Sequence, residues 1–203
     1  MSSGDRGEMT RRAVIGAAAT AAFVPVSAIR SAAQTTAPRP SIFTQEQRRT
    51  LEALLDRLCP ADELGPGAVE MGARNYIEIQ LGDYLAPEKQ MFLDGLTALD
   101  AYARESQGSG LADLSPEKRD QALMDIDSGK APPNTRTFFV RARRLMLEGM
   151  FGDPHYGGNQ NFAGWDLIKY PGPRPATSPE MQKMGVPIAP YHRSAWGAEH
   201  NGH

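Results

Sequence analysis

Apolar residues recur every three or four positions in five segments between residues 44 and 151, and proline or glycine residues separate these segments. This spacing puts the apolar side chains of each segment on one face of an α-helix, whereas a half-buried strand needs alternating apolar and polar residues. A length of 203 residues lies within the size range of one domain. The pattern therefore predicts an all-α fold, a small bundle of about five helices over residues 44–151.

The first predicted helix has the clearest start signal. Thr44 and Gln47 form a capping box, in which each side chain satisfies a free backbone N–H group of the other residue. The helix is expected to end near Pro60. Its core-facing leucines are Leu51, Leu54, Leu55 and Leu58.

Proline, glycine and capping residues set the expected bounds of the other four helices. The second should span residues 69–85, and the third should run from Pro87 to just before Gly108. A fourth is expected from Pro116 to Gly129, with Ser115 as its cap. Asn134 is a good cap for the fifth, which should continue to residue 151.

The texture changes at residue 152, where glycine, proline and asparagine become frequent and the helical periodicity disappears. We expect residues 152–203 to form a long irregular C-terminal extension with isolated aromatic residues. Loops of this length are rare in compact domains unless they are functional or disordered, and the tryptophans and tyrosines argue against disorder. Two alternatives stay open: the extension caps its own bundle, or it docks on another protein.

The beginning of the chain predicts an export signal. Arg11 and Arg12 are followed by a weakly apolar, alanine-rich run that is too short to span a bilayer, and this order is typical of a twin-arginine (Tat) signal peptide. We assign residues 1–33 to the signal and 34–43 to a linker, with cleavage after Ala28 or Ala33. The chain is therefore expected in the periplasm, carried there by a pathway that exports folded proteins.

Composition argues against several kinds of site. The net charge is −2 and the basic residues are scattered, which is unlike a nucleic-acid-binding protein. Cys59 is the single cysteine, so no cysteine-held metal or haem site fits, although a disulfide to another subunit is an alternative to simple burial. No G-x-G-x-x-G fingerprint is present. We therefore assign no catalytic, cofactor-binding or metal-ligating residues.

Two blocks of sequence resemble the gluconate 2-dehydrogenase subunit 3 family. One runs from Gly152 to Gly172 and includes Gly152-Asp153-Pro154-His155-Tyr156-Gly157-Gly158-Asn159 and Gly164-Trp165-Asp166-Leu167. The other, Cys59 to Ala68, is similar to the turn after the first helix of that family. The resemblance covers most of the chain.

The resemblance implies a non-catalytic small subunit of a membrane-associated dehydrogenase complex at the inner membrane. In such complexes a large subunit binds FAD and oxidises a sugar or sugar acid, and a multihaem cytochrome c subunit passes the electrons onward. The large subunit lacks its own signal, so the small subunit would assist its folding and its export through the Tat translocase.

The candidate partner-binding residues lie where the fifth helix meets the extension, and Trp165 and Tyr170 are the preferred anchors. The full set is Phe151, Asp153, His155, Tyr156, Trp165 and Tyr170. One alternative is an independent periplasmic enzyme or metal-binding protein that uses Asp153 and His155, and another is an electron carrier. Arg141, Arg143 and Arg144 form either a solvated helix face or a patch for an acidic partner.

Overall fold

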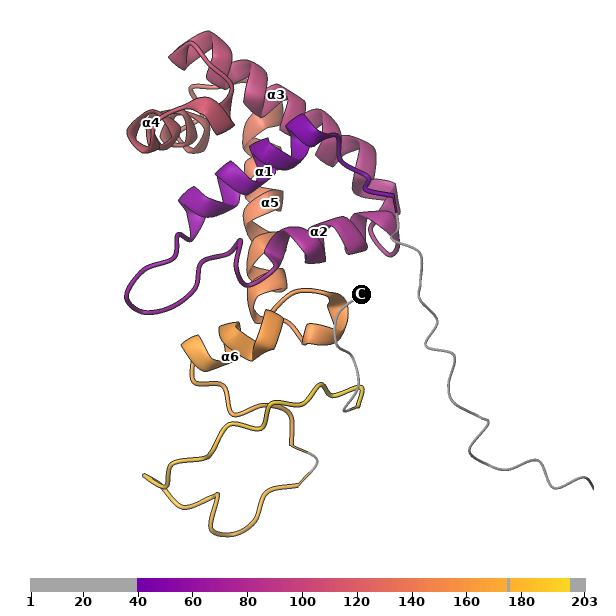
Figure 1. The fold of residues 1–203 in the computed structure, drawn as a ribbon, viewed down its shortest axis with the longest axis vertical. Helices are drawn as coiled ribbons and strands as arrows, with labels where there is room; N and C mark the ends of the chain where they lie inside the picture. The colour runs from indigo at the N-terminus through magenta and orange to yellow at the C-terminus, as the bar shows by residue number, and fades with distance from the viewer. Residues whose placement is uncertain (1–39, 175, 198–203) are drawn as a thin grey trace, which may run out of the picture. The chain divides into compact units, whose positions relative to one another are not determined.

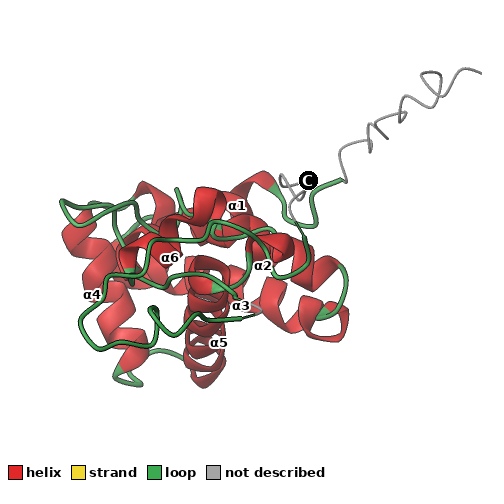
Figure 2. Cartoon of the chain, turned by 90° about the horizontal axis from the view of Figure 1, so that it is seen from below, coloured by secondary structure: helices red, strands yellow, loops and turns green. Residues whose placement is uncertain are grey.

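The computed structural model describes residues 40–174 and 176–197, so Arg11, Arg12 and the rest of the expected signal lie outside the described residues. The described part contains six α-helices and no strand, which confirms the all-α prediction (Figures 1 and 2). None of its helices is both long and apolar enough to cross a bilayer. The helices are α1 (Gln45–Leu58), α2 (Ala73–Gly82), α3 (Lys89–Gln107), α4 (Pro116–Asp127), α5 (Pro133–Phe151) and α6 (Ala163–Leu167).

The predicted capping box begins α1. The backbone N–H of Gln47 donates to Thr44 Oγ1 over 3.2 Å, and the backbone N–H of Thr44 donates to Gln47 Oε1 over 3.0 Å. Leu51, Leu54 and Leu55 are completely buried, as expected. Just before the helix, Phe43 is also buried and lies 6.2 Å from the Phe92 ring, so the end of the predicted linker packs on the bundle.

The second predicted helix is too long. Gly72, which precedes α2, has a φ of 80°, and Val69 lies in the turn before it. At the other end Leu85 precedes a short 3-10 helix, η2 (Ala86–Glu88). Val69 and Leu85 still pack against the core. The regular spacing of apolar residues in the sequence therefore extends beyond α2 into the turns on both sides, and it does not mark the ends of the helix.

The third and fourth helices lie close to their predicted positions. η2 contains Pro87, and α3 follows it directly and ends before Gly108, whose φ is 90°. The prediction that Asn134 caps the fifth helix is wrong, because Pro132 occupies the cap position and Asn134 lies in the first turn of α5. Pro133 has no N–H group to satisfy and suits the first helical position, so this helix begins without an asparagine cap.

α5 lies at the centre of the bundle and contacts α2, α3 and α4 (Figure 1). Glycines allow α3 and α2 to approach α5 closely. A side chain at Gly95 of α3 would overlap the Phe138 ring of α5, and a Cβ atom at Gly149 would lie 3.0 Å from the Cα of Ala73 in α2. In the core, Phe92 and Phe138 pack edge to face with centroids 4.9 Å apart.

The first part of the C-terminal extension is more regular than predicted. It contains α6 and two 3-10 helices, η4 (Pro154–Tyr156) and η5 (Gln160–Phe162). The five residues of α6 span little more than one helical turn, so they are too few to establish an apolar period. From Ile168 to Gly197 the described chain has turns and irregular structure, as the sequence predicted.

Candidate functional site

A single buried side chain fastens the start of the extension to the end of α5. Asn159 is completely buried. Its Nδ2 donates to the carbonyl oxygen of Gly152 over 2.9 Å, and its Oδ1 accepts from the Gly164 amide over 2.8 Å. The backbone N–H of Asn159 donates to the carbonyl oxygen of Gly149 over 2.7 Å. Asn159 therefore joins the end of α5, the loop after it and the start of α6.

Glycines bring the backbone of the loop directly onto the backbone of α5. A Cβ atom at Gly158 would overlap the carbonyl oxygen of Gly149, and one at Gly164 would overlap that of Met150. Only glycine, which has no Cβ atom, allows the backbone to come this close at these two positions. Any larger residue at either position must push the loop away from the helix.

Trp165 points inward. Its side chain is only 4% exposed, and its Nε1 donates to the carbonyl oxygen of Phe151 over 2.9 Å. The Tyr170 ring packs edge to face on Trp165 with centroids 5.1 Å apart and is itself exposed. The structure thus brings three of the candidate partner-binding residues together, with Trp165 covering the end of its own bundle and Tyr170 outside it.

The other three candidates gather with the end of the described chain. Asp153 accepts hydrogen bonds from the His155 amide at Oδ1 over 2.9 Å and from the Ala195 amide at Oδ2 over 2.8 Å. The His155 ring stacks on Trp196 at 5.4 Å and meets the edge of Tyr156 at 5.2 Å. Both oxygens of Asp153 therefore serve to hold the extension, while Tyr156 and Trp196 are exposed.

A third contact involves three residues outside the predicted set. His192 Nε2 lies 2.7 Å from Asp166 Oδ1, and the His192 ring stacks almost parallel on Phe162 at 5.0 Å. Phe162 has a φ of 61°, which is rare for a bulky residue. Within the described ranges no three His, Cys, Asp or Glu side chains are grouped so that they could hold a metal ion.

The extension then projects as an arm, which we define as residues 176–190. The segments that flank the arm meet at its base, where the backbone N–H of Tyr191 donates to the carbonyl oxygen of Pro171 over 2.9 Å. A side chain at Gly172 would overlap the Tyr191 carbonyl, and the Arg174 guanidinium lies 5.5 Å from the Tyr191 ring centre. Almost all residues of the arm are exposed. Its apolar side chains Met184, Val186 and Ile188 therefore face solvent.

The two sequence blocks singled out above meet in space. The backbone N–H of Gln160, in the second block, donates to the carbonyl oxygen of Met71, just beyond the first block, over 3.0 Å. Within the first block, Gly65 faces the Leu167 side chain of α6. Cys59 is half-buried, and this burial raises the pKa of its thiol above the ordinary value. The turn that contains the first block therefore forms part of the surface against which the extension packs.

Comparison with known proteins gives one match. A family described as gluconate 2-dehydrogenase subunit 3 matches residues 45–172, from the start of α1 to the base of the arm. No curated protein and no solved structure matches the chain.

Proposed function

This chain belongs to the gluconate 2-dehydrogenase subunit 3 family, and on that premise we propose that it is the non-catalytic small subunit of an exported flavoprotein dehydrogenase complex. In this proposal its docking partner is the large subunit, which binds FAD and oxidises a sugar or sugar acid. The small subunit assists the folding of that partner and takes it through the Tat translocase to the periplasm. A multihaem cytochrome c subunit completes the complex at the inner membrane.

One observation carries the docking role. Among the described residues, 14 large hydrophobic side chains are exposed, and eight of them lie on the C-terminal extension. Single exposed apolar residues are normal, but their concentration in one segment is typical of an interaction site. We name these eight residues the extension surface: Tyr156, Ile168, Tyr170, Met184, Val186, Ile188, Tyr191 and Trp196.

Five of the six candidate residues divide into two roles within this proposal. Trp165, Asp153 and the backbone of Phe151 hold the extension on the bundle through the hydrogen bonds described above. Tyr156 and Tyr170 are exposed and lie on residues that are held in this way. Rigid aromatic side chains supply contact area at low entropic cost, which suits them to anchor a partner.

Twin-arginine export supports the escort role, because this pathway carries folded proteins and so allows a partner without a signal to travel bound to one that has it. Binding also stabilises the folded partner by mass action. The large subunit should therefore depend on this chain for its location and for its folding or flavin retention.

The test is deletion of the gene, followed by measurement of where the large subunit is found and how much flavin it holds. We expect the large subunit to stay in the cytoplasm or to be degraded there. Grafting residues 1–33 onto the large subunit then separates export from support, and periplasmic location with little activity is the expected result. A large subunit with normal location and activity after the deletion would refute the escort role.

A further inference from the structure

The side of α5 that faces away from the core carries a mixed basic and apolar stripe. Counted from Arg136, its other members lie four, seven, eight and eleven positions later in the sequence. This spacing places all of them on one helix face. Val140 is 55% exposed and Leu147 is 41% exposed. We define this α5 outer face as Arg136, Val140, Arg143, Arg144 and Leu147.

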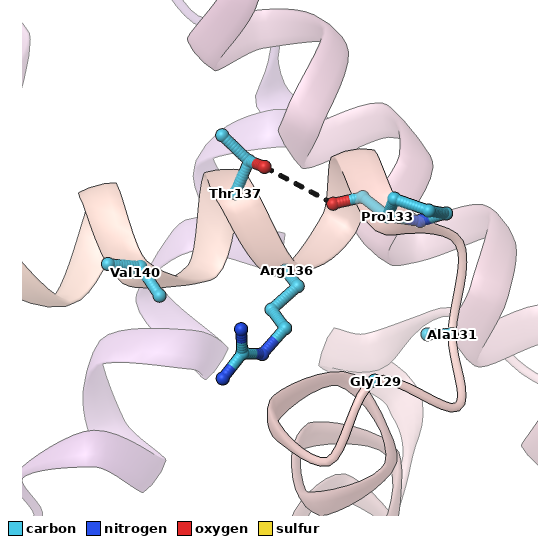
Figure 3. A pocket seen from close by; sticks show the side chains of 6 residues that line it. All are labelled: Gly129, Ala131, Pro133, Arg136, Thr137 and Val140. Atoms are coloured by element: carbon cyan, nitrogen blue, oxygen red, sulfur yellow. Dashed lines mark hydrogen bonds between the residues drawn. The ribbon is translucent and has the colours of Figure 1, made fainter.

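Two adjoining surface hollows meet at Val140. The first has a volume of about 530 Å³ and extends from α5 to the turn after α4; Figure 3 shows Gly129 and Ala131 on that turn. The second has a volume of about 400 Å³ and reaches Leu147. Together they follow the outer face along more than two turns of α5.

Arg136 is fixed in the first hollow. Its Nε donates to the carbonyl oxygen of Asp127 over 2.9 Å, and Figure 3 shows its side chain reaching from α5 toward the segment that carries Gly129. The Thr137 hydroxyl donates to the carbonyl oxygen of Pro133 over 3.3 Å. The hollow thus combines the apolar atoms of Ala131, Pro133 and Val140 with one guanidinium held in place.

The outer face has an excess of positive charge. Arg141 does not contribute, because it is turned inward and makes two hydrogen bonds to the Glu88 carboxylate, of 2.6 and 2.8 Å. Glu148 is occupied at both oxygens, by Arg144 over 2.9 Å and by the Tyr76 hydroxyl over 3.1 Å. No carboxylate in the described part of the chain forms an ion pair with Arg136 or Arg143. Two guanidinium groups therefore remain for an external acidic group.

We propose that the α5 outer face docks an acidic surface of a second protein chain of the complex. Carboxylates of that chain pair with Arg136 and Arg143, whose planar donor groups match a carboxylate at two points. An apolar side chain between those carboxylates occupies the hollow beside Val140. This inference rests on the proposed function, because it takes its partner from the same complex.

The composition of the face favours a protein over a lipid surface. A helix that lies on a bilayer needs a broad apolar face with large side chains and a strongly basic opposite face. The outer face offers only Val140 and Leu147, and the carboxylates of Asp127 and Glu148 border its second hollow.

The face is separate from the extension surface. α5 packs on α4 near its beginning and on α6 at its end, where the extension starts (Figure 1). No residue of the outer face belongs to the extension surface. The two surfaces can therefore engage different partners, or different parts of one partner, at the same time.

The test uses the complex purified with an R143K variant of this chain. This substitution keeps the charge and introduces a primary amine, which carbodiimide joins to a carboxylate only when the two groups touch. Mass spectrometry should find an amide bond from position 143 to an aspartate or glutamate of another subunit. Bonds to this chain alone, or none, in an intact complex would overturn the inference.

A charge-reversal variant gives an independent measurement. R136E combined with R143E should weaken binding of the purified partner subunit at least about tenfold and reduce the salt dependence of binding. The control K118E changes an exposed lysine of α4 and should have less than about a twofold effect. Unchanged binding of the double variant would contradict the proposal.

Two further outcomes separate the explanations. If vesicles of phosphatidylglycerol bind the wild type but not the double variant, while binding of the partner subunit is unchanged, the face is a lipid site and the inference is wrong. If no other subunit purifies with the wild-type chain, the proposed function fails together with this inference. A complex that loses its partner only in extension variants leaves the proposed function intact and refutes the role of α5.

Discussion

The indole Nε1 of Trp165 donates a hydrogen bond to the main-chain oxygen of Phe151, the last residue of α5, over 2.9 Å. The two residues are 14 positions apart, and this bond fixes α6 against the end of the central helix. The ring is buried at the same time. One side chain therefore supplies apolar contact and also a donor for the Phe151 carbonyl, which has no partner within the helix. Stability of the extension and partner binding should therefore depend on different aromatic residues.

Trp165→Ala should destabilise the chain. Removing a buried tryptophan leaves a cavity and an unpaired carbonyl, and such changes cost about 3–5 kcal/mol. Thermal unfolding followed by circular dichroism would measure the loss. Trp165→Phe should recover part of the stability, because it restores apolar volume without the hydrogen bond. A fully stable Trp165→Ala variant would show that the indole does not cap the bundle.

Tyr170→Ala should have the opposite profile. The tyrosine is 41% exposed and loses only its edge-to-face contact with Trp165, so its removal should cost about 0.5–1.5 kcal/mol of stability, less than Trp165→Ala. As an anchor it should cost at least about 2 kcal/mol of partner binding, measured by titration calorimetry with the purified large subunit. Tyr84→Ala is a matched control, because Tyr84 is exposed and lies outside the extension surface. Equal binding of the two variants would remove Tyr170 from the interface.

Asn159→Ala should also loosen the extension. It removes two side-chain hydrogen bonds and places alanine at a φ of 45°, which together cost about 2–4 kcal/mol. Asn159→Gly separates the two effects, since glycine adopts that φ freely but makes neither bond. Protection of the Gly164 amide from hydrogen exchange is the direct measurement. Unchanged protection in both variants would show that Asn159 is not the fastening residue.

Local signals were sufficient to predict the bundle. The capping box at Thr44 and the leucine spacing of α1 act within one or two turns, and both are confirmed. The ends of α2 were not predictable, because Val69 and Leu85 pack against the core from turns and so extend the apolar spacing. Helix periodicity reports burial, and burial continues beyond the helix.

The site was predictable only in part. The frequent glycines of the 152–172 block are visible in the sequence, and the structure uses two of them, Gly158 and Gly164, for close backbone approach to α5. The role of Asn159 depends on contacts with Gly149 and Gly152, which no spacing reveals. A weak signal existed, because asparagine tolerates positive φ better than most residues. The inward direction of Trp165 likewise required knowledge of where α5 ends.

Alkaline pH should destabilise the chain through Tyr76. Burial, followed by the charge of Glu148, raises the pKa of Tyr76 from 10.0 to about 12. The folded state thus holds the phenolic proton more tightly than the unfolded state. Its contribution is complete below pH 10 and is lost as the pH rises toward 12. Tyr76→Phe should show a shallower fall in the free energy of unfolding between pH 10 and 12 in urea titrations; an identical fall would contradict this origin.

Export should depend on the paired guanidinium groups of Arg11 and Arg12. Changing both residues to lysine keeps the charge but removes the planar donor groups that a receptor can recognise. We expect the precursor to accumulate in the cytoplasm, measured by cell fractionation and immunoblotting. Arg6→Lys is the control, since Arg6 lies outside the pair. Normal periplasmic amounts of the double variant would refute the signal assignment.

The contact between Pro171 and Tyr191, which closes the base of the arm, has a consequence for changes in the length of this loop. Because Pro171 and Tyr191 are joined there, residues between them can change in length without shifting the helices. Doubling a flexible loop costs only about 0.6 kcal/mol. Changes in the length of the arm should therefore cost little folding free energy, and under the proposed docking role they would change the surface offered to the partner.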